Sequence, residues 1–244
     1  MRIKLTLGYD GTSYCGWQVQ PNGTSVQELI EKAVFEVTGE KVRVTGSGRT
    51  DSGVHALGQT AHFDTESKTV EPKKFYRALN AHLPESIRVY KSEQVSDDFD
   101  ACRWAKKKTY QYSLYLSEVE NPLKERFAVR VDDNLDVEKM RSLSKVFLGE
   151  HDFKCMCATG SSIKTTVRTI YNIEVTQNGN DIAITVTGNG FLYNMVRILV
   201  GTLLNVGKGQ TDEKGLKQML LTGERKLGGR TLPAKGLCLL SVEY

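Results

Sequence analysis

Residues 1–39, MRIKLTLGYDGTSYCGWQVQPNGTSVQELIEKAVFEVTG, contain the pattern that decides the fold class. Apolar and polar residues alternate over 3–9, and this period of two predicts a half-buried β-strand. Ser25 and Glu28 have the spacing of a capping box, in which each side chain satisfies a free amide of the first helical turn. Gly39 can end that helix in a left-handed turn. The chain is therefore expected to open with a strand followed by a helix.

The next part of the sequence continues with two strands, a helix and a strand. Short strands are expected over 41–44 and 59–64. A helix is expected to begin at Pro72, a favourable first-turn residue, and to end before Pro84. A strand over 87–90 follows. The first half of the chain thus has the order β-α-β-β-α-β, which is typical of a ferredoxin-like half.

The second half repeats this order. Its expected elements are a strand over 110–116, a helix over 136–148, strands over 167–176 and 182–187, helices over 191–206 and 212–221, and a strand over 236–244. Asn178-Gly179-Asn180 joins the two middle strands, and these residues tolerate the positive φ of a hairpin turn. We therefore predict an α+β fold of two ferredoxin-like β-α-β-β-α-β halves with mixed, mainly antiparallel sheets.

Charge clusters over 97–100 and 106–108 mark the expected boundary between the halves. We place the N-terminal half at 1–104 and the C-terminal half at 105–244, although no repeat is visible in the sequence itself. The chain has 244 residues, which is enough for two modest domains with buried cores.

Composition favours a globular protein in the cytoplasm. Hydrophobic residues make up 39% and charged residues 25%, which argues against disorder. The formal net charge of +4 permits a nucleic-acid partner without requiring one. The five scattered cysteines argue against a disulfide framework, and the N-terminal residues show no apolar signal segment. The apolar segment 191–206 contains Asn194 and Arg197 and is too short to span a membrane.

The most distinctive loop is Gly46-Ser47-Gly48-Arg49-Thr50-Asp51-Ser52-Gly53-Val54-His55-Ala56. Its glycines permit sharp turns or close approach to a ligand. Arg49 and Asp51 are two residues apart, so an extended chain points both side chains to one side. A nearby arginine favours the ionised carboxylate, which suits a nucleophile or an electrostatic stabiliser. The spacing alone is more typical of a polar surface loop held by an ordinary ion pair.

Other kinds of site do not match the sequence. Asp51-Ser52-Gly53 has the short motif of an aspartic protease, but no second Asp-Ser/Thr-Gly supplies the required partner. A dinucleotide-binding loop needs a third glycine at the position of Asp51. His151, Cys155 and Cys157 are half of a zinc site at most, because no second cluster completes four ligands. The residues therefore do not favour a metal site.

Basic and aromatic residues adjoin each other near the expected boundary between the halves: Arg103, Trp104, Lys106, Lys107, Lys108, Tyr110 and Tyr112. Cations contact phosphates and flat rings stack on unpaired bases, although a solvated charge run before a core strand has the same composition. Arg197 lies in an otherwise apolar helical segment, where an unpaired charge is costly. It must reach solvent or an anion, and Asp51 is one candidate.

Several motifs, in order along the chain, resemble the TruA family of tRNA pseudouridine synthases. The loop signature is Gly48-Arg49-Thr50-Asp51-Ser52-Gly53-Val54-His55-Ala56. The others are Tyr9-Asp10-Gly11-Thr12, Gly16-Trp17-Gln18, Thr24-Ser25-Val26-Gln27, Lys107-Lys108-Thr109-Tyr110-Gln111-Tyr112, Gly149-Glu150-His151-Asp152-Phe153, Phe191-Leu192-Tyr193-Asn194-Met195-Val196-Arg197 and Gly236-Leu237-Cys238-Leu239. The resemblance extends over essentially the whole chain.

The resemblance implies a pseudouridine synthase fold with a catalytic cleft between its halves. It implies that Asp51 is the catalytic aspartate, that Arg49 helps to hold a uridine flipped out of its stack, that Tyr110 packs on the target uracil and that Arg197 pairs with the aspartate. The implied reaction is the isomerisation of uridine to pseudouridine at positions 38, 39 and 40 of the tRNA anticodon stem-loop. The family uses no cofactor or metal and forms homodimers.

The alternative is a non-catalytic ferredoxin-like module that binds RNA, because sheets with aromatic faces bind single strands without chemistry. Asp51 distinguishes the two hypotheses, since a carboxylate facing a polyanion serves no purpose in simple binding. The sequence leaves open whether Asp51 attacks the ribose or the base, or assists through a glycal route.

Overall fold

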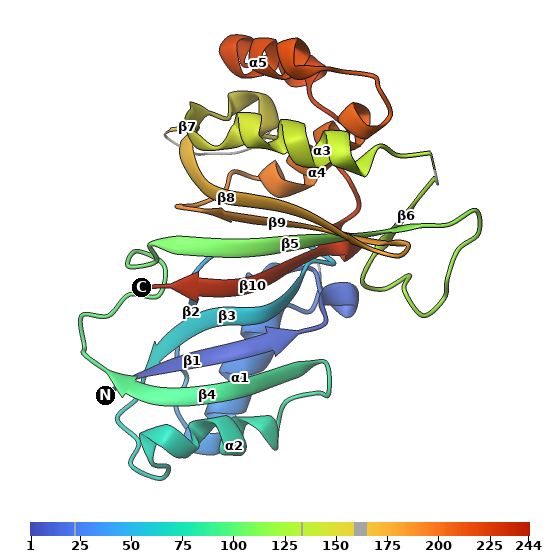
Figure 1. Ribbon diagram of the computed structural model, residues 1–244. Helices are drawn as coiled ribbons and strands as arrows, with labels where there is room; N and C mark the ends of the chain where they lie inside the picture. Colours follow the sequence, from blue (N-terminus) through green and yellow to red (C-terminus); the bar gives the residue numbers. More distant parts are fainter. Residues whose placement is uncertain (22, 133, 159–164) are drawn as a thin grey trace. The chain divides into compact units, whose positions relative to one another are not determined.

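A computed structural model describes residues 1–21, 23–132, 134–158 and 165–244 (Figure 1). The described chain divides into two compact units, which are described separately below. Unit 1 consists of Met1–Lys106 together with Cys238–Tyr244, and unit 2 consists of Lys107–Leu237. Each unit combines helices with a mainly antiparallel sheet, which confirms the predicted α+β class.

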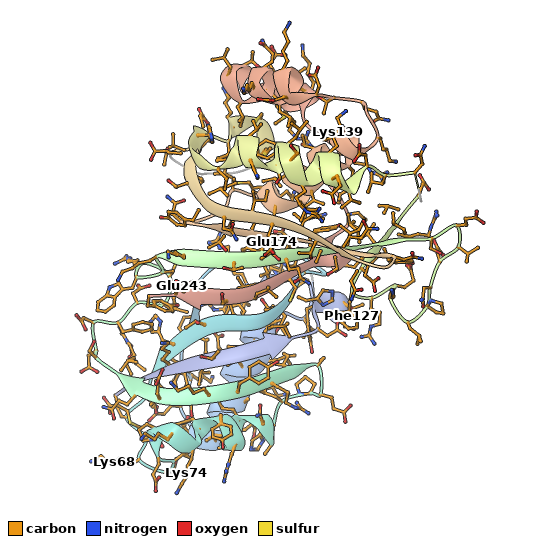
Figure 2. All side chains as sticks on the ribbon, in the orientation of Figure 1. Lys68, Lys74, Phe127, Lys139, Glu174 and Glu243 are labelled. Atoms are coloured by element: carbon orange, nitrogen blue, oxygen red, sulfur yellow. The ribbon has the colours of Figure 1, made fainter. Side chains whose placement is uncertain are left out.

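The first part of unit 1 has the predicted order β-α-β-β-α-β. Its elements are β1 (Arg2–Tyr9), α1 (Val26–Thr38), β2 (Thr45–Gly46), β3 (His55–Asp64), α2 (Phe75–Asn80) and β4 (Ile87–Val95). Strand β1 lies between β3 and β4 and is antiparallel to both (Figure 1). Strand β10 (Leu237–Glu243) pairs with β3 in parallel. The short strand β2 pairs with β3 in the antiparallel sense and lies outside the main strand order. Exposed cations such as Lys68 and Lys74 lie near α2 (Figure 2).

Helix α1 has the predicted ends. The Ser25 hydroxyl accepts a hydrogen bond from the Glu28 amide at 3.3 Å, and the Glu28 carboxylate accepts one from the Ser25 amide at 3.5 Å. Gly39 ends the helix with φ 75°. Between these ends the apolar face is buried, including Ile30 and Val34. The capping box is thus confirmed, because its hydrogen bonds form within a few residues of the chain.

The strand predicted over 41–44 does not form. The Gln27 side chain donates to the Val44 carbonyl at 2.8 Å, and the Val44 amide donates to the Glu31 carboxylate at 3.0 Å. Side chains of α1 therefore take the hydrogen bonds that a strand partner would supply. The neighbouring strands are longer than predicted: β3 begins at His55, and β4 continues to Val95 along the full length of β1.

Unit 2 contains more strands than predicted. Its elements are β5 (Lys107–Leu116), β6 (Val129–Val131), α3 (Val137–Ser144), β7 (Gly149–Asp152), β8 (Val167–Asn178), β9 (Asp181–Gly188), α4 (Met195–Gly207) and α5 (Glu213–Thr222). Its strands follow the order β5-β9-β8-β7, and β6 pairs in parallel with β5. The β8–β9 hairpin is confirmed, with Gly179 at φ 56° in its turn. The short strands β6 and β7 were not predicted, so a plain β-α-β-β-α-β order is wrong for this half.

The buried helix begins later than predicted. The segment predicted as helical from 191 reaches α4 only at Met195, because Asn194 has φ 61°. A left-handed residue cannot belong to a right-handed helix, so the chain forms a turn at Tyr193 and Asn194 before α4 begins. Most of α4 is buried, as predicted. Across the described ranges, no helix combines the length and the apolar character that crossing a membrane requires.

Candidate active site

The loop between β2 and β3 carries Arg49 and Asp51 in unit 1. Arg49 is exposed and Asp51 is half-buried, whereas Ser47, Thr50 and Val54 in the same loop are buried. The Val54 amide donates to the Asp51 carbonyl at 3.1 Å, which closes a turn directly after the aspartate. The buried neighbours hold the loop while the two charged residues remain accessible.

The segment that follows β1 binds one side of this loop. The Trp17 amide donates to the Thr50 carbonyl at 3.0 Å. The Tyr14 carbonyl accepts from the Ser52 hydroxyl at 3.1 Å and from the Gly53 amide at 3.4 Å. Hydrogen bonds therefore fix the residue before Asp51 and the two residues after it.

Strand β3 binds the other side of the loop through Gln59. The Ser47 hydroxyl donates to the Gln59 side-chain oxygen at 2.6 Å, and the Gln59 side-chain nitrogen donates to the Gly48 carbonyl at 3.0 Å. Gln59 is fully buried, so these bonds are shielded from water. The loop is consequently attached to the sheet ahead of Arg49 as well as around Asp51.

Arg49 does not orient Asp51 through an ion pair. Among the residues that the structure describes, Arg49 has neither an ion pair nor a hydrogen bond, and its side chain is exposed. The expectation that Arg49 holds the carboxylate is therefore wrong for this structure. Thr50, between them, is held through both its backbone and its side chain.

Tyr110 lies in unit 2, near the start of the pairing between β5 and β9. Its side chain is buried, with 9% exposure, and it is opposite Val186. The Phe191 ring meets it edge to face, with 5.3 Å between the ring centroids and 87° between the planes. An aromatic pair of this geometry fixes the orientation of the Tyr110 ring.

Arg197 lies in the first turn of α4, also in unit 2. Its Nε donates to the Leu232 carbonyl at 2.7 Å, and its Nη1 donates to the Asn194 side-chain oxygen at 2.5 Å. The left-handed conformation of Asn194 occurs at the residue that caps this turn. Two neutral oxygens thus hold the guanidinium of a half-buried arginine.

The structure therefore places Arg49 and Asp51 in one loop of unit 1, and Tyr110 and Arg197 in unit 2. The pairing of Asp51 with Arg197 and the cleft between the halves stay predictions. Sequence reasoning missed the residues that support the loop, above all Tyr9, Tyr14, Trp17 and Gln59. The sequence feature that could have indicated them is the presence of polar and aromatic residues at inward-facing positions of β1 and β3 and just after β1. Apolar residues are usual at such positions.

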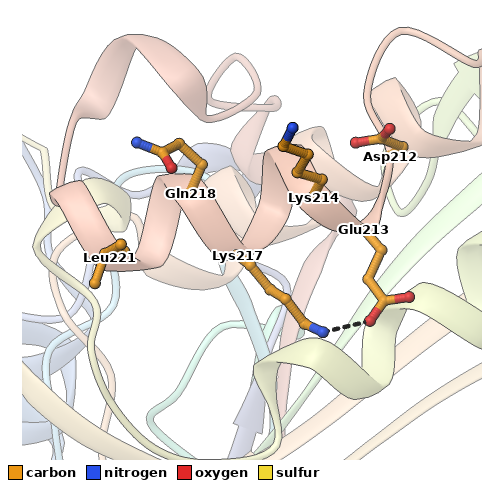
Figure 3. A pocket seen from close by; sticks show the side chains of 6 residues that line it. All are labelled: Asp212, Glu213, Lys214, Lys217, Gln218 and Leu221. Atoms are coloured by element: carbon orange, nitrogen blue, oxygen red, sulfur yellow. Dashed lines mark ion pairs between the residues drawn. The ribbon is translucent and has the colours of Figure 1, made fainter.

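The remaining polar clusters and pockets of the described residues belong to no predicted site. No group of three or more His, Cys, Asp or Glu side chains in those ranges is placed to hold a metal ion. The ring nitrogen Nε2 of His151 lies 2.8 Å from the Leu148 carbonyl oxygen, so the histidine is engaged locally. A shallow pocket on α5 is lined by residues of that helix and its cap: Asp212, Glu213, Lys214, Lys217, Gln218 and Leu221 (Figure 3). An ion pair of 2.6 Å joins Glu213 and Lys217 across it.

Comparison with known proteins agrees with the motifs. The family model described as tRNA pseudouridine synthase matches residues 7–103 and 143–244. The chain is 46% identical over 242 residues to tRNA pseudouridine synthase A 2 of Clostridium perfringens, covering 99% of each chain. It is 44% identical over 242 residues to tRNA pseudouridine synthase A of Clostridium acetobutylicum, again with 99% of each chain covered. It is 44% identical over 244 residues to the Shouchella clausii protein of that name, covering 100% of this chain and 93% of the relative.

The family match includes Arg49, Asp51 and Arg197, whereas Tyr110 falls between its two segments. The match spans most of the chain, and the identity to full-length relatives extends from end to end. This chain therefore belongs to the TruA family of tRNA pseudouridine synthases, which are isomerases.

Proposed function

We propose that this protein isomerises uridine to pseudouridine in tRNA and that the Asp51 carboxylate is its catalytic group. The observation that carries the proposal is the construction of the Asp51 loop. Thr50, before Asp51, accepts a hydrogen bond from the Trp17 amide, and Ser52 and Gly53, after it, donate to the Tyr14 carbonyl, while Asp51 itself is only half-buried. A reactive group on a rigid support can be held in productive geometry, which is a large part of enzymatic rate enhancement.

A carboxylate suits this reaction. The N-glycosidic bond breaks, the uracil turns, and a bond from carbon five of the base to the ribose replaces the lost one. The proton on carbon five is exchanged for one on the former glycosidic nitrogen, so the composition of the nucleotide does not change. Asp51 can act as nucleophile toward ribose or base, or stabilise the positive charge that develops on the sugar.

The other predicted site residues have distinct roles in the proposal. The target base must leave its stack before Asp51 can reach it, and an exposed cation such as Arg49 can hold the displaced strand. The fixed ring of Tyr110 would pack on the flipped uracil. Arg197 would pair with Asp51, since its guanidinium is already fixed by two neutral acceptors.

The substrate in this proposal is the anticodon stem-loop of tRNA, with uridines 38, 39 and 40 as targets, and the working form is a homodimer. The named relatives are tRNA pseudouridine synthases, which supports tRNA as the substrate class. Exposed cations near the end of unit 1, Arg103 and Lys106, suit contacts with phosphates. All five cysteines are free thiols, which fits a cytoplasmic protein.

The test is incubation of purified protein with unmodified tRNA transcripts that carry uridine at only one of positions 38, 39 and 40. Pseudouridine is then mapped by chemical probing. The wild type should modify these transcripts, and Asp51→Asn should bind tRNA but form no pseudouridine. Asp97→Asn is the matched control, because it removes an exposed carboxylate of the same unit and should leave turnover unchanged.

Two results would contradict the proposal. Turnover by Asp51→Asn, with contaminating enzyme excluded, would remove Asp51 from the reaction. Binding of tRNA without any modification by the wild type would favour the alternative of a non-catalytic RNA-binding module.

A further inference from the structure

Two buried hydroxyl groups form a hydrogen bond at the residue that precedes Asp51. The hydroxyl of Tyr9, at the end of β1, is 2.8 Å from the hydroxyl of Thr50, the residue that precedes Asp51. Tyr9 is 5% exposed and Thr50 is 7% exposed, so the hydrogen bond is shielded from water. Burial raises the pKa of the Tyr9 phenol, which therefore stays protonated and neutral.

Thr50 is consequently fixed at two points. The Trp17 amide holds its carbonyl oxygen at 3.0 Å, and Tyr9 holds its side chain. The Tyr9 and Trp17 rings also contact each other, with centroids 6.2 Å apart. Because both the backbone and the side chain of Thr50 are held, the backbone conformation just before Asp51 is fixed. The position of the Asp51 carboxylate is thereby tied to the end of β1.

We infer that Tyr9 and Thr50 are positioning residues for Asp51 in uridine isomerisation. Neither residue is assigned to contact RNA. They act through the backbone by keeping the carboxylate where the reacting atoms of a flipped uridine arrive. The inference rests on the proposed catalytic role of Asp51.

Stability alone does not account for this pair. When both partners of a buried hydrogen bond are replaced by apolar groups of the same shape, the effect on stability is often nearly neutral. Phenylalanine at position 9 and valine at position 50 would fill the same space as Tyr9 and Thr50. A purely structural contact would therefore tolerate that double replacement, whereas a contact that sets the Asp51 geometry would not.

The experiment measures single-turnover rates on tRNA transcript, with enzyme in excess, over a range of enzyme concentrations up to saturation, together with thermal unfolding. The variants are Tyr9→Phe, Thr50→Val, their combination, and Thr50→Ser, which keeps the hydroxyl. We expect each hydroxyl deletion to slow the maximal rate by roughly 10-fold to 100-fold, the range expected when a reacting group is displaced. The enzyme concentration that gives half the maximal rate should not change. Thr50→Ser, which keeps the hydroxyl, should have the maximal rate of the wild type.

The double variant provides the sharpest result. It should unfold close to the wild-type temperature and be no slower than the slower single variant, because both changes remove the same interaction. Tyr244→Phe is the matched control. It deletes a tyrosine hydroxyl that donates to the Ala101 carbonyl at 2.8 Å in the same unit, and its maximal rate should be that of the wild type.

A double variant with the wild-type rate overturns the inference, and so does a rate loss in Tyr244→Phe as large as that in Tyr9→Phe. The failure of the proposed function is a separate result. If Asp51→Asn is active, Asp51 is not catalytic, whereas an inactive Asp51→Asn with a fully active Thr50→Val overturns the positioning role alone.

Discussion

Gly16 lies against the backbone of Thr50. A Cβ atom at Gly16 would be 2.5 Å from the Thr50 carbonyl oxygen and 3.2 Å from the carbonyl carbon of Asp51. Gly16 also has φ 111°, a conformation that side chains rarely allow. The segment after β1 therefore contacts the loop of Asp51 through a residue that must lack a side chain.

The first prediction concerns Gly16→Ala. The added methyl group should push the Thr50–Asp51 peptide out of place, lowering turnover while tRNA binding is kept. Gly39→Ala is the control, because Gly39 also has positive φ but nothing lies within 4 Å of its added Cβ. Both variants should lose stability, roughly 1 kcal/mol for Gly39→Ala, but only Gly16→Ala should lose turnover. Equal turnover in the two variants would show that the close approach of Gly16 is unimportant for the reaction.

The second prediction concerns Arg197 and Asp51. If they pair, Arg197→Met should impair both catalysis and folding by leaving a carboxylate without its partner. Adding Asp51→Asn should then cost less free energy of unfolding than it does in the wild type, with a coupling of about 0.5–3 kcal/mol. Arg141→Met is the control, since its Nε also donates to a backbone carbonyl, that of Val175. Additive unfolding free energies for Arg197 and Asp51 would show that the two residues do not interact.

The third prediction separates the ring of Tyr110 from its hydroxyl. Tyr110→Ala should weaken or abolish turnover, because stacking on a base is worth roughly 1–3 kcal/mol. Tyr110→Phe keeps the ring and its edge-to-face contact with Phe191. If the hydroxyl takes the proton from carbon five, the Phe variant should be slower by roughly 10²–10⁴-fold. If the Phe variant is as fast as the wild type, the Tyr110 ring acts by packing alone and its hydroxyl has no role in the reaction. If the Ala variant is fully active, Tyr110 is not part of the active site.

The fourth prediction concerns the cluster Lys106, Lys107 and Lys108. Affinity for tRNA should fall steeply with salt, because bound phosphates release counterions. Replacing all three lysines with glutamine should flatten the dependence of log Kd on log salt. The same change at the exposed residues Lys68, Lys73 and Lys74, which precede α2 in the sequence, serves as control. An equal slope for the wild type and the first variant would place the RNA contacts elsewhere.

The fifth prediction concerns thiol reactivity. Cys155 is fully buried, and burial raises the pKa of its thiol to about 11. The reactive thiolate is therefore scarce at neutral pH, and an alkylating reagent should reach Cys155 only after unfolding. Cys102 is exposed and should react in the native protein. Peptide mapping after native and denaturing alkylation would measure both, and rapid native labelling of Cys155 would contradict the buried environment.

Features that depend on neighbouring residues could be predicted from the sequence. The capping box of α1, the stop at Gly39 and the Gly179 hairpin form through contacts within a few residues, so their motifs are sufficient. The alternation of Ile3, Leu5 and Leu7 predicted β1 because one face of the sheet is buried. Family membership followed from the order of the motifs, which the comparisons confirm.

Boundaries set by distant partners were predicted less well. The backbone of Val44 pairs with side chains of α1, and α4 begins at Met195 because Asn194 is left-handed. Strand β10 was predicted as a strand, but its parallel pairing with β3 joins residues almost two hundred positions apart, as in Cys238 opposite His55. Alternation gives a strand its two faces and not its partner, so this pairing could not be read from the pattern.

The sequence by itself determined which residues carry the candidate chemistry: Asp51, Arg49, Tyr110 and Arg197 stand in motifs that it displays in full. Only the tertiary structure decided how Asp51 is held. The residues on either side of Asp51 form hydrogen bonds with Tyr9, Trp17 and Tyr14, more than thirty residues earlier in the chain. The physical reason is that such bonds exist only after folding brings the end of β1 against the loop, so no local spacing encodes them.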